Sequence, residues 1–213
     1  YGRNVTYSAI EKTVEFLFIL LLALLIDLSL GEPPGIIHPV VWMGKVISLW
    51  EKFAPVRNTK AQLVYGGCAV LLTIFIFALP VYFLLLYVRN ISPVAYVITG
   101  ALLLKTTFSF KELRRSAFDI KSLLAEDNLE EAREKMPALV SRETQNLGTP
   151  ALVSATVESL AENTCDSFVA PLFYFLLLGV PGAVAYRVVN TWDAMIGYHG
   201  KYEYLGRCPA KLD

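Results

Sequence analysis

Residues 63–88 read LVYGGCAVLLTIFIFALPVYFLLLYV, a run without a single charged side chain. A helix needs about 20 predominantly apolar residues to cross the hydrocarbon core of a bilayer, so this run predicts a membrane-spanning helix. Pro80 lies inside it and is tolerated there, because neighbouring helices can satisfy the carbonyl group that the proline frees. The sequence therefore predicts an integral membrane protein.

Two further runs predict spanning helices. Residues 14–30 read VEFLFILLLALLIDLSL, with Asp27 close to the end, and residues 94–110 form a weaker span. Lys105 interrupts the weaker span, and we expect it to snorkel to the membrane interface. The overall composition agrees, since 55% of the 213 residues are hydrophobic and only 18% are charged.

Charge and cysteine content exclude several classes of function. Lys plus Arg and Asp plus Glu each number 19, so the charge balance indicates no nucleic-acid partner. The three cysteines lack the spacing of a metal site, and we interpret them as free thiols. Phosphate-loop, dinucleotide-binding and HExxH motifs do not occur in the sequence.

The basic residues predict the orientation in the membrane. The segment 31–62 holds four Lys or Arg residues and the segment 111–162 holds seven, whereas the link between the second and third spans holds only Arg89. Basic loops stay in the cytoplasm, so both large loops are predicted to be cytoplasmic and the N-terminus external. Residues 111–163 show apolar residues at helical spacing and predict a small cytoplasmic helical region.

The last apolar stretch, residues 168–189, reads FVAPLFYFLLLGVPGAVAYRVV and carries GVPG at its centre. Adjacent Gly and Pro mark a turn, which leaves arms of about 8–11 residues, too short to cross a membrane alone. Either the segment is a re-entrant, broken helical hairpin or it is one kinked span. We favour the hairpin, because it returns the polar residues on both flanks to the same, cytoplasmic, side.

Three carboxylates precede this stretch on one predicted helix face: Glu158, Glu162 and Asp166. These carboxylates repel one another, and near a bilayer the repulsion is strong, so we expect a cation to compensate them. Mg²⁺ suits this role, because it prefers carboxylates together with substrate phosphates. An ordinary solvated helix face is the alternative.

Asn190 and Asp193 follow the apolar stretch 168–189, and either belong to the same site or cap a helix. His38 is one of two histidines, and a structural role for it is the commoner case.

The order of these motifs resembles the CbiB/CobD family of cobalamin-biosynthesis membrane proteins. The motifs are Asp27-x3-Gly-Glu-Pro-Pro-x3-His38-Pro-Val, Val140-Ser-Arg142-Glu-Thr144, Glu158-Ser-x-Ala-Glu162-Asn163-Thr164-x-Asp166, Ala185-Tyr186-x3-Asn190-Thr191-x-Asp193-x-Met-x-Gly-Tyr198, and Ala210-Lys211-Leu-Asp213. Departures from the family pattern are Ser141 for Gly, Glu143 for Asp, Cys165 for Ser, Ser167 for Gly and Lys211 for Arg. Family members also extend well beyond the position of Asp213, so their C-terminal third lies outside this sequence.

The apolar runs and the polar helical region together predict an all-α, polytopic membrane helical bundle with a broken helical hairpin and a small cytoplasmic helical region, with residues 1–213 as one membrane domain. The resemblance implies ATP-dependent amide formation between adenosylcobyric acid and (R)-1-aminopropan-2-ol or its O-phosphate, with ATP and Mg²⁺ as cofactors. It also implies a place in the prokaryotic inner membrane, and the basic loops put the site on the cytoplasmic side. Further copies of the chain or other pathway enzymes are conceivable partners beside membrane lipid, though no residue indicates them. The alternatives are a non-catalytic sensor of the AmpE type and a transporter, although the sequence shows no internal repeat.

Under this resemblance we assign roles to particular residues. Glu158, Glu162, Asp166 and Asp193 are the candidate Mg²⁺ ligands, and these four with His38 are the candidate catalytic residues. The candidate substrate- or nucleotide-binding residues are Asp27, Arg142, Thr144, Asn163, Thr164, Arg187, Asn190, Thr191, Tyr198 and Lys211.

Overall fold

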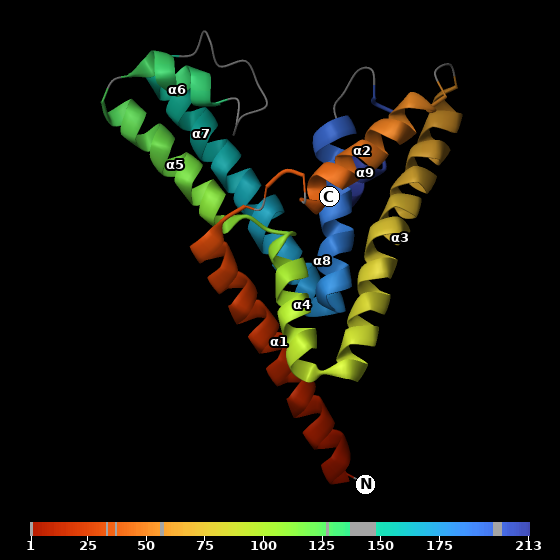
Figure 1. The fold of residues 1–213 in the computed structure, drawn as a ribbon. Helices are drawn as coiled ribbons and strands as arrows, with labels where there is room; N and C mark the ends of the chain where they lie inside the picture. The colour runs from red at the N-terminus through yellow and green to blue at the C-terminus, as the bar shows by residue number, and fades with distance from the viewer. Residues whose placement is uncertain are drawn as a thin grey trace.

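The computed structural model describes residues 2–32, 34–36, 38–55, 58–126, 128–136, 148–197 and 202–213, with side chains from residue 12 onward. Within these residues all regular secondary structure is helical, and there is no strand. The helices are α1 (Gly2–Leu30), α2 (Pro39–Lys52), α3 (Thr59–Ile91), α4 (Pro93–Lys105), α5 (Phe110–Ala125), α6 (Leu129–Lys135), α7 (Thr149–Thr164), α8 (Ala170–Ile196) and α9 (Pro209–Leu212), with a π-helical turn at Cys165–Val169 between α7 and α8 (Figure 1).

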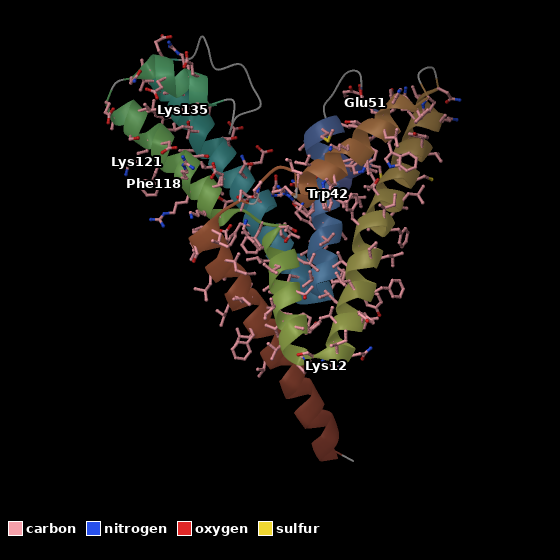
Figure 2. The ribbon with its side chains drawn as sticks, in the orientation of Figure 1. Lys12, Trp42, Glu51, Phe118, Lys121 and Lys135 are labelled. Atoms are coloured by element: carbon pink, nitrogen blue, oxygen red, sulfur yellow. The ribbon has the colours of Figure 1, made fainter. Side chains whose placement is uncertain are left out.

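Four helical stretches of the described chain are long and apolar enough to cross a membrane: Lys12–Leu30, Thr59–Ile91, Pro93–Ala125 and Thr149–Ile196. Their inward faces form one core, to which α1 contributes Ile19, α3 Val70, α4 Ala101 and α8 Val188. Their outward faces carry large apolar side chains, and Figure 2 shows such side chains along the outside of the bundle. In water such exposure would be unfavourable, so this distribution is that of a lipid-facing surface.

Gly179 reverses the chain within α8. Its φ of 72° and ψ of −165° break the helix there, in a region of backbone space that is essentially restricted to glycine. The rings of Tyr174 and Tyr186, on opposite sides of the break, stack with their centroids 5.1 Å apart. In a continuous helix, twelve residues would separate them by about 18 Å. Figure 1 shows α8 returning beside the segment that descends from α7.

The predicted all-α membrane bundle with a broken hairpin is therefore confirmed. The turn of the hairpin lies deep in the bundle, since the ring of Phe16 on α1 stacks on Phe175 at 5.2 Å. A hairpin of this kind carries the end of α7 and the C-terminal arm of α8 to the same end of the molecule.

Three details of the structure differ from the predictions. The third spanning stretch is not one helix over residues 94–110, because α4 ends at Lys105 and α5 begins in a new direction at Phe110. Lys105 does not snorkel to water, since it is only 4% exposed. The segment 31–62, interpreted as a loop, contains α2, whose start is capped by His38 and opened by Pro39.

Candidate functional site

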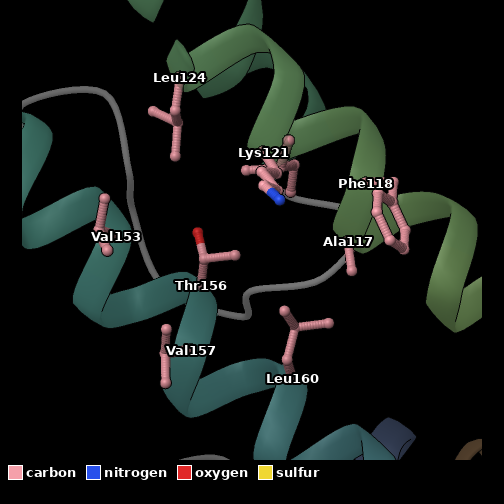
Figure 3. A pocket seen from close by; sticks show the side chains of 9 residues that line it. Ala117, Phe118, Lys121, Leu124, Val153, Thr156, Val157 and Leu160 are labelled. Atoms are coloured by element: carbon pink, nitrogen blue, oxygen red, sulfur yellow. The ribbon is translucent and has the colours of Figure 1, made fainter.

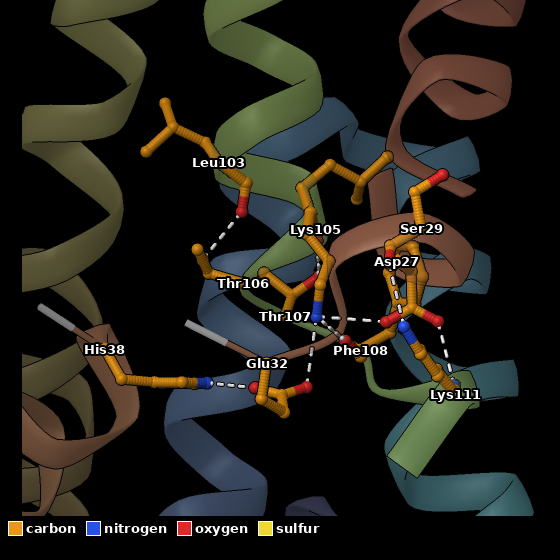
Figure 4. A network of polar contacts seen from close by, with 11 residues as sticks. Asp27, Ser29, Glu32, His38, Leu103, Lys105, Thr106, Thr107, Phe108 and Lys111 are labelled. Atoms are coloured by element: carbon orange, nitrogen blue, oxygen red, sulfur yellow. Dashed lines mark hydrogen bonds and ion pairs between the residues drawn. The ribbon is translucent and has the colours of Figure 1, made fainter. Parts of the chain in front are cut away.

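A buried cation lies between two carboxylates where α1 and α4 end (Figure 4). Nζ of Lys105 is 3.0 Å from Oδ1 of Asp27 and 3.0 Å from Oε1 of Glu32. The side chains of Lys105 and Asp27 are 4% and 1% exposed. A buried charge is tolerated only with such partners, because leaving water is otherwise strongly unfavourable. The network ties together α1, the loop after it and α4.

Local backbone geometry places Glu32 in this network. Gly31, at a φ of 73°, turns the chain away from the end of α1. The other oxygen of Asp27 accepts a hydrogen bond from the backbone N–H of Lys111 at 2.9 Å, so the same carboxylate also positions the start of α5. Nζ of Lys111 donates to the carbonyl of Ser29 at 2.8 Å.

His38 continues the network toward α2. Its Nδ1 accepts a hydrogen bond from the backbone N–H of Val40 at 3.2 Å, which caps the helix. A neutral imidazole with Nδ1 as acceptor carries its proton on Nε2, and Nε2 lies 2.5 Å from Oε2 of Glu32. Both ring nitrogens are therefore engaged. This arrangement suits a residue that positions Glu32 better than one that takes up a proton.

The contacts of Glu32 keep it ionised. Burial alone would raise the pKa of its carboxyl group, but hydrogen bonds from His38, Ser109 and Lys105 outweigh burial and lower the pKa from 4.5 to about 2. A cavity of about 450 Å³ adjoins Glu32 and Lys105, with mostly apolar walls that include Leu30 and Leu102.

The hairpin packs directly against this network. The backbone N–H of Ser109 donates to the carbonyl of Ser167 at 3.1 Å. The ring of Phe168 lies between those of Phe108 and Phe110, with centroids 5.9 and 5.1 Å away. Ser167 and Phe168 belong to the π-helical turn, an arrangement that is frequent at functional sites.

The acidic residues on both arms of the hairpin come together, as the hairpin interpretation required. The carboxylate of Asp166 interacts electrostatically with those of Asp213, Glu162 and Asp193. In the described part of the chain, no three His, Cys, Asp or Glu side chains are close enough to hold a metal ion by themselves. Mg²⁺ usually keeps only one or two protein carboxylates and takes its other ligands from water and substrate phosphates. A metal bound beside Asp166 and Asp193 would therefore need most of its ligands from water or from a substrate phosphate.

Arg187 joins the acidic cluster to the Lys105 network. Its guanidinium group interacts electrostatically with Glu32 as well as with Asp213 and Asp166. Nη1 donates to Oδ1 of Asn190 at 3.0 Å, while its buried Nε has no hydrogen-bond acceptor among the described residues. A guanidinium with a buried, unused donor is suited to a phosphate or carboxylate ligand.

The remaining predicted site residues are placed differently. Three hydroxyl or amide groups bond to the backbone of their own helices: Asn163 to Ser159, Thr164 to Leu160 and Thr191 to Arg187. Lys211 is exposed on α9, and Glu158 is exposed on α7, two turns before Asp166. Arg142, Thr144 and Tyr198 lie outside the described residues.

The sequence analysis assigned no role to Lys105, nor to Glu32 and Asp213, although the last two stand in the family motifs. A lysine inside an apolar span and a carboxylate directly after one are signals that could have paired Lys105 with Glu32. The side-chain amide of Asn190 donates to Oδ2 of Asp213 at 3.4 Å. The two residues are distant in the sequence, so no local pattern predicts this contact.

Comparison with known proteins agrees with the arrangement. The family model of the CobD/CbiB protein matches residues 20–213. The chain is 50% identical over 200 residues to the cobalamin biosynthesis protein CobD of Dehalococcoides mccartyi, covering 94% of this chain and 65% of that protein. It is 44% identical over 194 residues to the probable cobalamin biosynthesis protein CobD of Pyrococcus furiosus, covering 90% and 65%.

The chain thus spans about two-thirds of the length of these relatives, 65% in both cases. No solved structure matches it. The family model covers the spanning helices except residues 2–19 of α1, and it covers every residue of the site described above. The chain belongs to the CobD/CbiB protein family.

Proposed function

We propose that the protein acts in cobalamin biosynthesis as an ATP-dependent ligase that forms an amide bond. The substrates would be adenosylcobyric acid and (R)-1-aminopropan-2-ol or its O-phosphate, and the product adenosylcobinamide or its phosphate. The observation that carries the proposal is the convergence of Arg187 with the carboxylates of Asp166 and Glu32 at one end of the hairpin. Family membership supplies the pathway.

The reaction needs an activated carboxylate. The corrinoid carboxylate attacks the terminal phosphorus of ATP, ADP leaves, and an acyl phosphate forms. The amine, after losing its proton, then attacks the acyl carbon, and phosphate leaves as the amide forms. Both steps build up charge on phosphate oxygens, so positioning and charge neutralisation dominate the catalysis.

Particular residues suit these tasks. Arg187 would hold the transferred phosphate or the substrate carboxylate through its unused Nε–H. Asp166 and Asp193 would hold Mg²⁺, which neutralises phosphate charge when it is bound. A carboxylate of the cluster would accept the ammonium proton, since both ring nitrogens of His38 are engaged.

We further propose that the protein spans the inner membrane of a prokaryotic cell and that this site faces the cytoplasm. The network and the acidic cluster lie at the same end of the bundle as the basic segments around α2 and α5 (Figure 1). Basic segments remain on the cytoplasmic side, where ATP is available.

The test uses the protein at the full length of its relatives, purified in detergent with ATP, Mg²⁺, adenosylcobyric acid and aminopropanol phosphate. We expect ADP and adenosylcobinamide phosphate in equal amounts. Asp166→Asn and Asp193→Asn should each lower turnover at least a hundredfold, about 2.7 kcal/mol. The matched control is Asp119→Asn, whose carboxylate is 51% exposed on α5. A protein that binds these compounds without turnover would instead be a sensor, and the ligase proposal would fail.

A further inference from the structure

An open apolar groove of about 410 Å³ lies between α5 and α7, outside the site described above (Figure 3). Its walls include Leu124 from α5 and Val153, Val157 and Leu160 from α7, and among the described residues that line it only Lys121 is charged. Val157 is 61% exposed. The groove thus combines a long apolar floor with a single cation at its edge.

The adjoining face of α5 is basic and aromatic. At 100° per residue, Arg114, Arg115, Phe118 and Lys121 fall within an arc of about 120° that contains no carboxylate. Phe118 is 56% exposed. Two cations flank its ring: the guanidinium carbon of Arg114 is 5.5 Å and Nζ of Lys121 is 5.7 Å from the ring centroid. In Figure 2, Phe118 and Lys121 lie on the outer side of α5, away from α8.

This face begins where the lipid-facing surface of α1 ends. Lys111, at the start of α5, bonds to the last turn of α1 through Asp27 and Ser29. That turn exposes Leu28 and Leu30, which are 50% and 78% exposed. Lipid chains that cover these leucines carry their headgroups to the level at which α5 starts.

We propose that the α5–α7 groove binds an anionic phospholipid. Its phosphate contacts Arg114 and Lys121, and one acyl chain turns out of the bilayer and lies in the groove along Leu124, Val153 and Val157. Charge selects this occupant, since basic residues beside a spanning helix attract anionic headgroups. The apolar floor selects it too, because a ligand with a polar periphery would leave its hydrogen-bonding groups unpaired there. The inference is independent of the proposed reaction.

The test places a tryptophan in the groove and asks which lipid reaches it. Phe118→Trp protein, in nanodiscs of phosphatidylcholine, receives increasing fractions of brominated phosphatidylglycerol or brominated phosphatidylcholine. The parent protein, with its own tryptophans, supplies the background. We expect the added fluorescence to be quenched at a much lower fraction of the brominated phosphatidylglycerol.

Adding Arg114→Gln and Lys121→Gln should raise the half-quenching fraction of phosphatidylglycerol about fivefold for each charge removed. The matched control, Lys60→Gln with Lys135→Gln, removes two exposed cations outside the groove and should leave that fraction unchanged. Equal quenching by the two lipids, or no effect of the Arg114 and Lys121 changes, would overturn the proposal. Relief of quenching by adenosylcobyric acid would also overturn it, by assigning the groove to the corrinoid.

Discussion

The ammonium group of Lys105 lies 3.0 Å from the carboxylate of Asp27, and both side chains are almost completely buried. They come from α4 and α1, two parallel helices of the bundle that are adjacent in space and distant in sequence. The pair closes the end of the bundle at which the site is built.

Lys105→Met should destabilise the protein by about 3–5 kcal/mol, because Asp27 is left buried without its cation. Combining it with Asp27→Asn should recover part of that loss, since the uncompensated charge is removed. Unfolding by urea in detergent micelles measures both. Lys60→Met, at an exposed position at the start of α3, is the control and should be nearly neutral. Equal losses for Lys105→Met and Lys60→Met would mean that the buried pair contributes little.

Stability should depend on Glu32 at acidic pH. Its pKa in the folded protein, about 2, lies below the ordinary 4.5, so ionised Glu32 stabilises the fold above about pH 4.5. This contribution is lost as the pH falls from 4.5 toward 2. In Glu32→Gln, unfolding midpoints measured over that range should fall less steeply with decreasing pH. Parallel pH profiles of the two proteins would contradict the assignment.

Gly179→Ala should strain the hairpin turn. An L-residue at a φ of 72° and ψ of −165° occupies a region reserved for glycine, at a cost of about 1–3 kcal/mol. The new Cβ would also lie 3.4 Å from Cζ of Phe16. Gly148→Ala is the matched control, because a Cβ there meets nothing within 4 Å and φ is −75°. Thermal unfolding should shift for Gly179→Ala alone, and equal shifts would argue against a strained turn.

The orientation in the membrane can be checked with single cysteines. In a protein with Cys68, Cys165 and Cys208 changed to serine, Gly148→Cys should react with an impermeant maleimide only in inside-out vesicles. Asn90→Cys, at an exposed position in the last turn of α3, should react only in right-side-out vesicles. The reverse pattern would place the site outside the cell.

Local patterns predicted much of the fold. Length and hydropathy identified the spanning runs in α1 and α3, and the GVPG sequence predicted the reversal that Gly179 makes. The start of α2 could also be predicted, since Pro39 follows a residue able to cap a helix, but α2, with 14 residues, is too short to stand out as a spanning run. The end of α4 at Lys105 was not readable, because the turn that follows depends on contacts of Ser109 and Phe108 with the hairpin.

The site was predicted less completely than the fold. Spacing placed Glu162 and Asp166 on one face of a helix, and the hairpin brought Asp193 to them. The partners of Asp27 and the neighbours of Arg187 come from distant segments, so only the packed structure identifies them. Predictions that involve Arg142, Thr144 and Tyr198 fall outside the described residues and stay predictions.

The number of residues in the π-helical turn at Cys165–Val169 sets how α7, and α5 packed against it, are oriented relative to the hairpin. In that turn the N–H of Ala170 bonds to the carbonyl of Cys165, five residues back instead of four. Removing one residue there would restore an ordinary helix and rotate α7 by about 100° relative to the hairpin. Val153 and Val157 would then point away from α5, while α1, α3 and α4 kept their sequences. Family members with an insertion or deletion at this point should therefore carry the arm in a different orientation on the same membrane bundle.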